Sequence, residues 1–159
     1  MGKKSTKENK CVYQLAREAA GFTREAASEA MEYISDDRIE KIERGVLDAH
    51  PEEVITMSEC YKDATLCNYY CSHECPIGQK YVPEVSIKDL SQITLEMLAS
   101  LNAMEKEKNR LIEITVDGKI TEDEKADFEK IQQELKDISI SIQSMQMWIE
   151  HTALTGELE

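Results

Sequence analysis

Three cysteines and one histidine lie within nine residues near the middle of the chain. The segment reads Cys67-Asn-Tyr-Tyr-Cys71-Ser-His73-Glu-Cys75, and Cys60 precedes it by seven residues. Cys67 and Cys71 are four residues apart, so on a helix they share one face. Three thiolates and one imidazole are a sufficient tetrahedral ligand set for zinc. The sequence therefore offers one candidate metal site, at Cys67, Cys71, His73 and Cys75.

Two other interpretations of these cysteines are open. Free cysteine is among the most buried residue types and packs as a small apolar side chain. The cluster is also more compressed than the two separated pairs of ligands usual in structural zinc sites, which favours buried, reduced thiols and no cofactor. A redox or disulfide role is the third interpretation. The chain has five cysteines and begins without an export signal, so we expect reduced thiols in a cytoplasm.

Little else in the chain has the spacing that catalysis requires. Residues 113–124 partly match a calcium-binding loop, but Glu113 and Thr115 stand where the first and third ligands should be. A helix-to-helix turn capped by Thr121 explains the same segment. No glycine-rich phosphate loop occurs, and the three histidines are scattered: His50, His73 and His151. We therefore expect a protein that is not an enzyme.

The charge of the chain limits its partners. The formal net charge is -13, whereas proteins that bind a DNA duplex are usually basic. Residues 1–84 carry 11 Lys and Arg against 16 Asp and Glu, a net of -5, and residues 85–159 carry 8 against 16, a net of -8. The C-terminal half is thus the less favourable surface for nucleic acid. No apolar run approaches the roughly 20 residues that span a bilayer, so no membrane association is expected.

The N-terminal half has the pattern of several short helices. Residues 1–10 are polar and basic and predict a flexible tail. Residues 11–78 then predict a domain of five helices. Five residues mark the helix boundaries. Gly21 and Gly45 end helices, Thr23 and Ser35 are N-caps, and Pro51 lies in a first helical turn. The fifth helix is expected from about residue 64 to 74, and residues 79–86 are expected to form an extended linker.

The C-terminal half predicts two long helices that pair as an antiparallel hairpin over residues 87–154. We expect their buried seam at positions spaced by alternating steps of three and four. In the first helix these are Ile87, Leu90, Met97, Leu101, Met104 and Leu111. In the second they are Phe128, Ile131, Leu135, Ile138, Ile142, Met145 and Ile149.

Further apolar residues flank this expected seam and would be exposed on an isolated hairpin. They are Ile93, Leu95, Leu98, Ile112, Ile114, Ile140, Met147 and Trp148. A large exposed apolar strip usually marks a partner surface. We therefore expect a homodimer through residues 87–154, closing as a four-helix bundle. The alternative is that the N-terminal domain covers the strip.

The stretch from Gly21 to Gly45 resembles the core of the XRE family of helix-turn-helix regulators, the Cro and phage-repressor type. The matching residues are Gly21, Phe22, Thr23, Glu25, Ala27, Ser35, Ile39, Ile42, Glu43 and Gly45. The resemblance covers about residues 10–78. It implies an all-α fold in which a five-helix repressor-like helix-turn-helix domain precedes the long antiparallel hairpin.

The same resemblance implies double-stranded DNA as the partner, with the third helix in the major groove and the second on the phosphates. Arg24 would contact phosphate. Ser35, Asp36, Asp37, Arg38 and Lys41 would lie on the groove-facing part of the third helix, with Arg38 reading guanine and with Lys41 and Arg44 reaching phosphate. The sequence thus predicts a sequence-specific transcriptional regulator of bacterial or mobile-element type.

A second function is compatible with the same scaffold. Asp36, Asp37 and Glu40 lie at or near the start of the expected recognition helix, where phosphates would repel them. Carboxylates also stabilise a helix N-terminus, by about 0.3–1 kcal/mol each. The alternative is therefore an adaptor that does not bind DNA and uses the helix-turn-helix scaffold and the hairpin to bind another protein.

Overall fold

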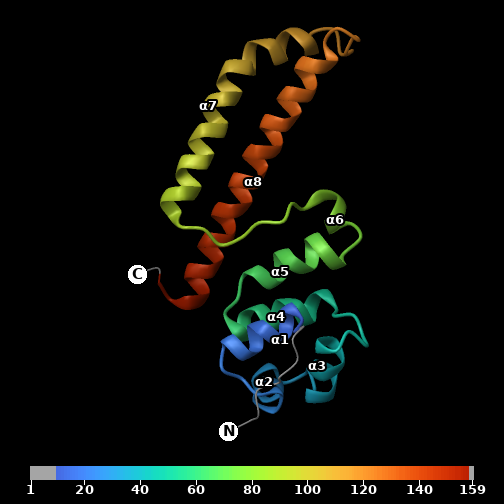
Figure 1. Cartoon of the computed structure of the whole chain (residues 1–159), viewed down its shortest axis with the longest axis vertical. Coiled ribbons are helices and arrows are strands. Elements are labelled where there is room, and N and C mark those ends of the chain that lie inside the picture. The colour runs from blue at the N-terminus through green and yellow to red at the C-terminus, as the bar shows by residue number, and fades with distance from the viewer. Residues whose placement is uncertain (1–9, 158–159) are drawn as a thin grey trace. The chain divides into compact units, whose positions relative to one another are not determined.

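The computed structural model describes residues 10–157, and every regular element within that range is a helix (Figure 1). The predicted all-α fold with a C-terminal pair of long helices is confirmed. Residues 1–9 of the predicted basic tail lie outside the described residues. Among those described, no helix combines the length and the apolar character that crossing a membrane requires.

The described residues divide into two compact units, one of residues 10–84 with 150–157 and the other of residues 85–149. The first unit contains α1 (Val12–Ala19), α2 (Arg24–Met31), α3 (Asp36–Glu43), α4 (Pro51–Tyr61), α5 (Thr65–Tyr69), the π-helix η1 (Tyr70–Glu74) and α6 (Gly78–Tyr81). The second contains α7 (Leu90–Thr115) and most of α8 (Lys125–Thr155).

The starts of α2, α3 and α4 follow the sequence signals. The Thr23 hydroxyl oxygen accepts the Ala26 N–H at 3.1 Å, and the Ser35 hydroxyl oxygen accepts the Arg38 N–H at 3.2 Å. Pro51 is the first residue of α4, where its missing N–H has no cost. These caps satisfy backbone donors that each helix would otherwise leave unpaired, so the short elements start where the sequence predicts.

The core of the first unit lies between α1, α2, α3 and α4. The inner face of α2 packs on α3 and α4, and the inner face of α3 packs on α1 and α2. Burying a large aliphatic side chain contributes about 1.5–3 kcal/mol, so this core holds helices too short to be stable alone. Its buried apolar members are Tyr13, Ala16, Ala27, Met31, Ile34, Ile39, Ile42, Ala49, Val54, Met57, Tyr61 and Leu66.

The fifth helix has the expected extent but consists of two elements, and the expected linker begins later than predicted. After α5 the backbone widens into the π-helix η1, and the Cys75 N–H donates to the Tyr70 carbonyl at 2.9 Å. Residues 78–81 then form α6 instead of extended chain. Helix α6 packs closely on η1, since a Cβ atom on Gly78 would clash with the Cys71 carbonyl oxygen. Only glycine allows this contact between α6 and η1.

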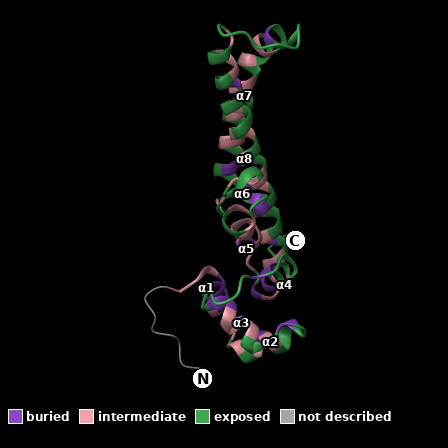
Figure 2. Cartoon of the chain, turned by 90° about the vertical axis from the view of Figure 1, so that its right-hand side faces the viewer, coloured by how far each residue is buried: buried purple, intermediate pink, exposed green. Residues whose placement is uncertain are grey.

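The second unit is an antiparallel pair of helices, α7 and α8 (Figure 1). Arg110 pairs with Asp127 at 2.7 Å between Nε and Oδ2, and Glu107 pairs with Lys130. Moving three residues back along α7 therefore moves three residues forward along α8. In Figure 2 the hairpin is mostly exposed or intermediate, with few buried residues.

The predicted seam of the hairpin was correct at alternate positions, which are Met97, Met104, Leu111, Ile131, Ile138 and Met145, and wrong at the others. Ile93 and Ile114, expected on the outside, are 0% and 1% exposed, whereas Leu101, Leu135 and Ile142 are 47%, 47% and 46% exposed. The observed seam on α7 is Ile93, Met97, Ser100, Met104, Glu107, Leu111 and Ile114. That on α8 is Ile131, Glu134, Ile138, Ser141, Met145 and Trp148, and Ser144 and Met147 beside it are also buried. Serine and glutamate within these rows hid them from a search for apolar periodicity.

Candidate nucleic-acid interface

Helices α2 and α3 form a two-helix unit with one buried and one exposed side. Residues 32–35 connect the helices, and Ala27, Ile39 and Ile42 point into the core. The opposite side of α3 carries Asp37, Lys41 and Arg44, whose spacing of four and three residues makes one stripe. This stripe is the surface on which the sequence predicts contacts to DNA.

Arg38, the predicted guanine reader, is directed at α4 instead. Its Nε donates to Glu53 Oε1 at 2.7 Å, and its Nη2 donates to Glu53 Oε2 at 2.7 Å and to the Asp48 carbonyl at 2.8 Å. The hydrogen bonds from Arg38 lower the pKa of Glu53, and those to Glu53 raise the pKa of Arg38. Two parallel bonds between guanidinium and carboxylate are a strong and specific arrangement. Arg38 thus joins α3 to the start of α4.

Lys41 and Arg44 remain at the surface, each beside a carboxylate of the same helix. Lys41 Nζ lies 2.6 Å from Asp37 Oδ2, and Arg44 Nη1 lies 3.3 Å from Glu40 Oε1. The side chains of Lys41 and Arg44 are 45% and 57% exposed. Exposed pairs of this spacing contribute only about 0.3–0.5 kcal/mol each. These weak ion pairs leave Lys41 and Arg44 accessible to an anionic partner that binds them more strongly.

Arg24, the predicted phosphate contact at the start of α2, takes part in a buried charge cluster that sequence reasoning missed. Its Nε donates to Glu43 Oε2 at 2.8 Å. Glu43 is 1% exposed and also receives two hydrogen bonds from Arg17, at 2.6 and 3.0 Å. Arg17 further donates to the Phe22 carbonyl at 2.8 Å. One carboxylate therefore ties α1, α2 and α3 together, and its two arginines compensate its burial.

A local signal for this cluster was present but not used. Arg17 follows Ala16 and is four residues after Tyr13, so it lies on the buried side of α1. Glu43 is likewise next to Ile42 on the inner side of α3. A charged residue on an apolar helix face needs a partner of opposite charge. The partner lies 26 residues away, however, and no spacing rule connects the two.

The charges of residues 24–44 are mixed rather than segregated. The four cations are Arg24, Arg38, Lys41 and Arg44, and the seven acids are Glu25, Glu29, Glu32, Asp36, Asp37, Glu40 and Glu43. Each cation is in an ion pair with a carboxylate. The four predicted cations therefore do not form one uninterrupted basic face. The two most exposed cations, Lys41 and Arg44, each lie beside a carboxylate.

The described structure does not bring the four predicted metal ligands, Cys67, Cys71, His73 and Cys75, together. Within residues 10–157, no three His, Cys, Asp or Glu side chains are grouped so that they could hold a metal ion. His73 stacks on Tyr69, with ring centroids 4.6 Å apart, and its Nδ1 lies 3.2 Å from the Tyr69 carbonyl oxygen. Cys67 packs against the core, and the Cys75 sulfur accepts the Gly78 N–H at 3.4 Å. The predicted ligands are thus engaged separately.

The thiols in this structure are free and partly buried. Desolvation by burial raises the pKa of Cys11, Cys60, Cys67 and Cys71 above the ordinary thiol value. A raised pKa keeps a thiol protonated at neutral pH and lowers its reactivity, because the thiolate is the nucleophile and the metal ligand. Burial therefore makes these four thiols weaker nucleophiles than an exposed cysteine.

Comparison with known proteins gave no match: no protein-family profile, no curated protein and no solved structure is significantly similar to this chain. Any functional assignment therefore rests on the residues and geometry of the chain.

Proposed function

We propose that this protein is a DNA-binding transcriptional regulator of the helix-turn-helix type, and that the outer face of α3 enters the major groove. The observation that carries the proposal is the exposed stripe of Asp37, Lys41 and Arg44 on a helix whose opposite side is anchored in the core. A helix of this kind presents side chains to base edges without disturbing the fold. The resemblance of residues 21–45 to the XRE family agrees with this use.

The ion pairs of α3 are compatible with binding because they are weak. Replacing an exposed pair worth about 0.3–0.5 kcal/mol by a phosphate contact has a small cost. Arg44, at the C-terminal end of α3, is the principal phosphate contact in this proposal. Arg24 adds a second, although its bond to Glu43 restricts its reach. Arg38 is a positioning residue that fixes α3 on α4, so in this proposal it does not contact a base.

The Asp37–Lys41 pair suggests what the stripe would read. A G·C base pair exposes the cytosine amino donor beside the guanine O6 and N7 acceptors in the major groove. Asp37 provides an acceptor and Lys41 provides donors, and the two side chains lie side by side. This arrangement favours a G·C pair over an A·T pair at the centre of each half-site. Ser35 caps α3 through its hydroxyl oxygen and contributes helix order rather than a base contact.

The experiment is selection from a random-sequence duplex library by the full chain, at about 50 and 200 mM salt. The proposal predicts enrichment of a short site containing G·C pairs, with affinity falling steeply as salt rises. A pool that stays random at both salt concentrations contradicts it.

A second function, a protein-binding adaptor, is favoured by one specific observation. Glu43 is buried, but the other six acids of residues 24–44 outnumber the four cations there, all of which are in ion pairs. This acidic surface repels duplex DNA and attracts basic proteins. In this case the same library would stay random. Crosslinking in the host cell would then identify a partner, and the purified pair would weaken when Glu29, Glu32 and Asp36 are replaced by their amides. Full affinity of that triple variant for the partner would show that the surface of residues 24–44 is not the binding surface.

A further inference from the structure

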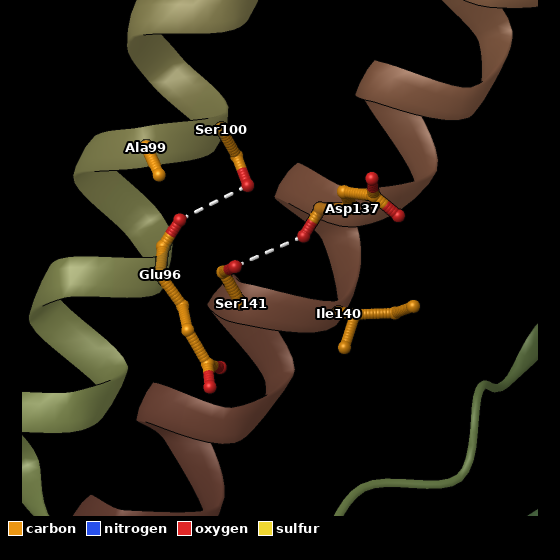
Figure 3. Close-up of a pocket in the computed structure, with 6 residues that line it drawn as sticks. All are labelled: Glu96, Ala99, Ser100, Asp137, Ile140 and Ser141. Atoms are coloured by element: carbon orange, nitrogen blue, oxygen red, sulfur yellow. Dashed lines mark hydrogen bonds between the residues drawn. The ribbon is translucent and has the colours of Figure 1, made fainter.

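The two long sides of the α7–α8 hairpin differ sharply in charge. Glu96, Ala99 and Ser100 of α7 and Asp137, Ile140 and Ser141 of α8 line a shallow pocket on one side of the seam (Figure 3). The seam serines are satisfied there by their own helices, since Ser100 donates to the Glu96 carbonyl and Ser141 to the Asp137 carbonyl, each at 3.0 Å. This pocket therefore identifies one side of the hairpin and, by helix geometry, the residues on the other.

The side opposite the pocket is defined by two rows, which we call the uncharged flank. The row on α7 is Thr94, Leu98, Leu101, Glu105, Lys108 and Ile112. The row on α8 is Phe128, Gln132, Leu135, Ser139, Ile142 and Gln146. Of these twelve residues only Glu105 and Lys108 are charged, and they form an ion pair with each other. The flank therefore has no net charge.

The equivalent rows on the pocket side contrast with it. They are 96, 99, 103, 106, 110 and 113 on α7 and 130, 133, 137, 140, 144 and 147 on α8. Ser144 and Met147 are buried, and six of the other ten residues are charged. In a chain that is 32% charged, about four charges are expected among twelve positions. Charge is thus depleted on one side only, and that side exposes Leu98, Leu101, Ile112, Leu135 and Ile142. Depletion of charge with exposed apolar side chains is the composition of an interface core.

We propose that the uncharged flank binds the uncharged flank of a second copy of this chain, which closes a four-helix bundle. Two copies of a chain with a net charge of -13 repel each other at most surfaces, and this flank is where they can approach without that cost. A symmetric dimer also requires a self-complementary patch, which a neutral apolar face provides.

The size of the flank agrees with a dimer. Helix α7 has 26 residues, so it is about 39 Å long at 1.5 Å per residue. With two helices packed about 10 Å apart, the face is about 20 Å wide and covers about 800 Å², the area that each partner gives to a stable interface of standard size. This inference does not depend on DNA binding, because it concerns a different helix pair.

The test is the mass of the full chain by light scattering at about 20 µM, for the wild type and three variants. Leu135→Glu and Ile142→Glu each introduce a carboxylate into the flank, and Leu95→Glu is the matched control. Leu95 is 69% exposed but lies on the outer surface of α7, away from both the seam and the flank. Helix content by circular dichroism shows that each variant is folded.

The proposal predicts twice the 18.1 kDa chain mass for the wild type and for Leu95→Glu. Leu135→Glu and Ile142→Glu should be monomers with unchanged helix content, their dimer dissociation constant raised at least about 100-fold. A monomeric wild type overturns the proposal. So does a dimer that survives both flank substitutions, or one that Leu95→Glu dissociates as readily. Failure of the library selection with an intact flank-dependent dimer would remove only the DNA proposal.

Discussion

Arg38 and Glu53 are joined by two parallel hydrogen bonds of 2.7 Å, and this pair connects α3 to the first turn of α4. Glu53 also accepts the His50 backbone N–H at 2.8 Å, so the same carboxylate caps α4. The residue that looked best suited to read a base is therefore part of the support of the helix. The orientation of α3 therefore depends on the contact between Arg38 and Glu53.

Replacing Arg38 should therefore lower stability before it changes recognition. We expect Arg38→Ala to reduce the free energy of unfolding by about 1–3 kcal/mol, since it leaves a charged hydrogen-bonded partner unpaired. Urea unfolding at pH 7 measures this. Lys62→Ala, at an exposed cation with no ion pair among the described residues, is the control and should change stability little.

The stabilisation from this pair should depend on pH in a defined direction. The pKa of Glu53 is lowered in the folded protein, so its contribution is complete above the ordinary carboxyl pKa near 4 and is lost as pH falls through the lowered value. The difference in stability between wild type and Arg38→Ala should shrink below about pH 4. A difference that is the same at pH 7 and pH 3 would contradict the role assigned to the pair.

The turn between α2 and α3 contains backbone strain that a glycine should relieve. Glu32 has φ 59° and ψ -49°, and the next N–H, that of Tyr33, donates to the Met31 carbonyl at 2.6 Å. This is a γ-turn of the rare type, which disfavours side chains. We expect Glu32→Gly to raise the free energy of unfolding by about 0.5–1.5 kcal/mol in thermal or urea unfolding. Glu29→Gly, inside α2, should instead be destabilising by about 1 kcal/mol.

Gly78 should tolerate no side chain. Gly78→Ala would place a methyl group against the backbone of Cys71, which cannot move without disrupting η1. Overpacking of this kind costs about 1–3 kcal/mol, and loss of protection from hydrogen exchange should concentrate in residues 70–81. The control, Lys80→Ala, lies two residues away on the exposed side of α6. Equal stability of Gly78→Ala and wild type would mean that η1 and α6 do not pack as described.

The raised thiol pKa values predict slow alkylation. Cys11, Cys60, Cys67 and Cys71 should react with iodoacetamide at pH 7.5 more slowly than a free peptide cysteine, and urea should remove the difference. Peptide mass spectrometry gives the rate at each position. Elemental analysis of the same protein, purified without added metal, should find less than about a tenth of an equivalent of zinc. Rapid alkylation or stoichiometric zinc would restore the metal interpretation.

The sequence predicted this protein well where the determinant is local. Thr23, Ser35 and Pro51 mark helix starts through contacts within four residues, and the sequence was sufficient to find them. It failed where the determinant is a distant partner. Arg17 and Glu43 meet across 26 residues, and Arg38 finds Glu53 on another helix, so neither pairing has a spacing signature.

The hairpin shows a different kind of failure. Ser100, Glu107 and Ser141 lie in the seam, where a search for apolar residues does not expect them, while Leu101, Leu135 and Ile142 supply an equally regular pattern on the flank. Two apolar rows one position apart cannot be ranked by periodicity. Ser141 can be buried because its hydroxyl donates to a carbonyl of its own helix, and the partly buried Glu107 carboxylate is paired with Lys130. The exposed apolar row that includes Leu101, Leu135 and Ile142 is then available to bind a partner.

The central claim is that Lys41 and Arg44 on α3 bind duplex DNA, and the most direct measurement is the salt dependence of affinity for the enriched duplex. If Arg24 and Arg44 of both copies in a dimer contact phosphate, affinity should fall about 100-fold between 50 and 200 mM salt. The Lys41→Ala/Arg44→Ala variant should bind more weakly at 50 mM and lose about half of that slope, whereas Lys62→Ala should keep both. Equal affinity and slope for the double variant and the wild type would contradict the account and exclude α3 as the DNA-binding surface.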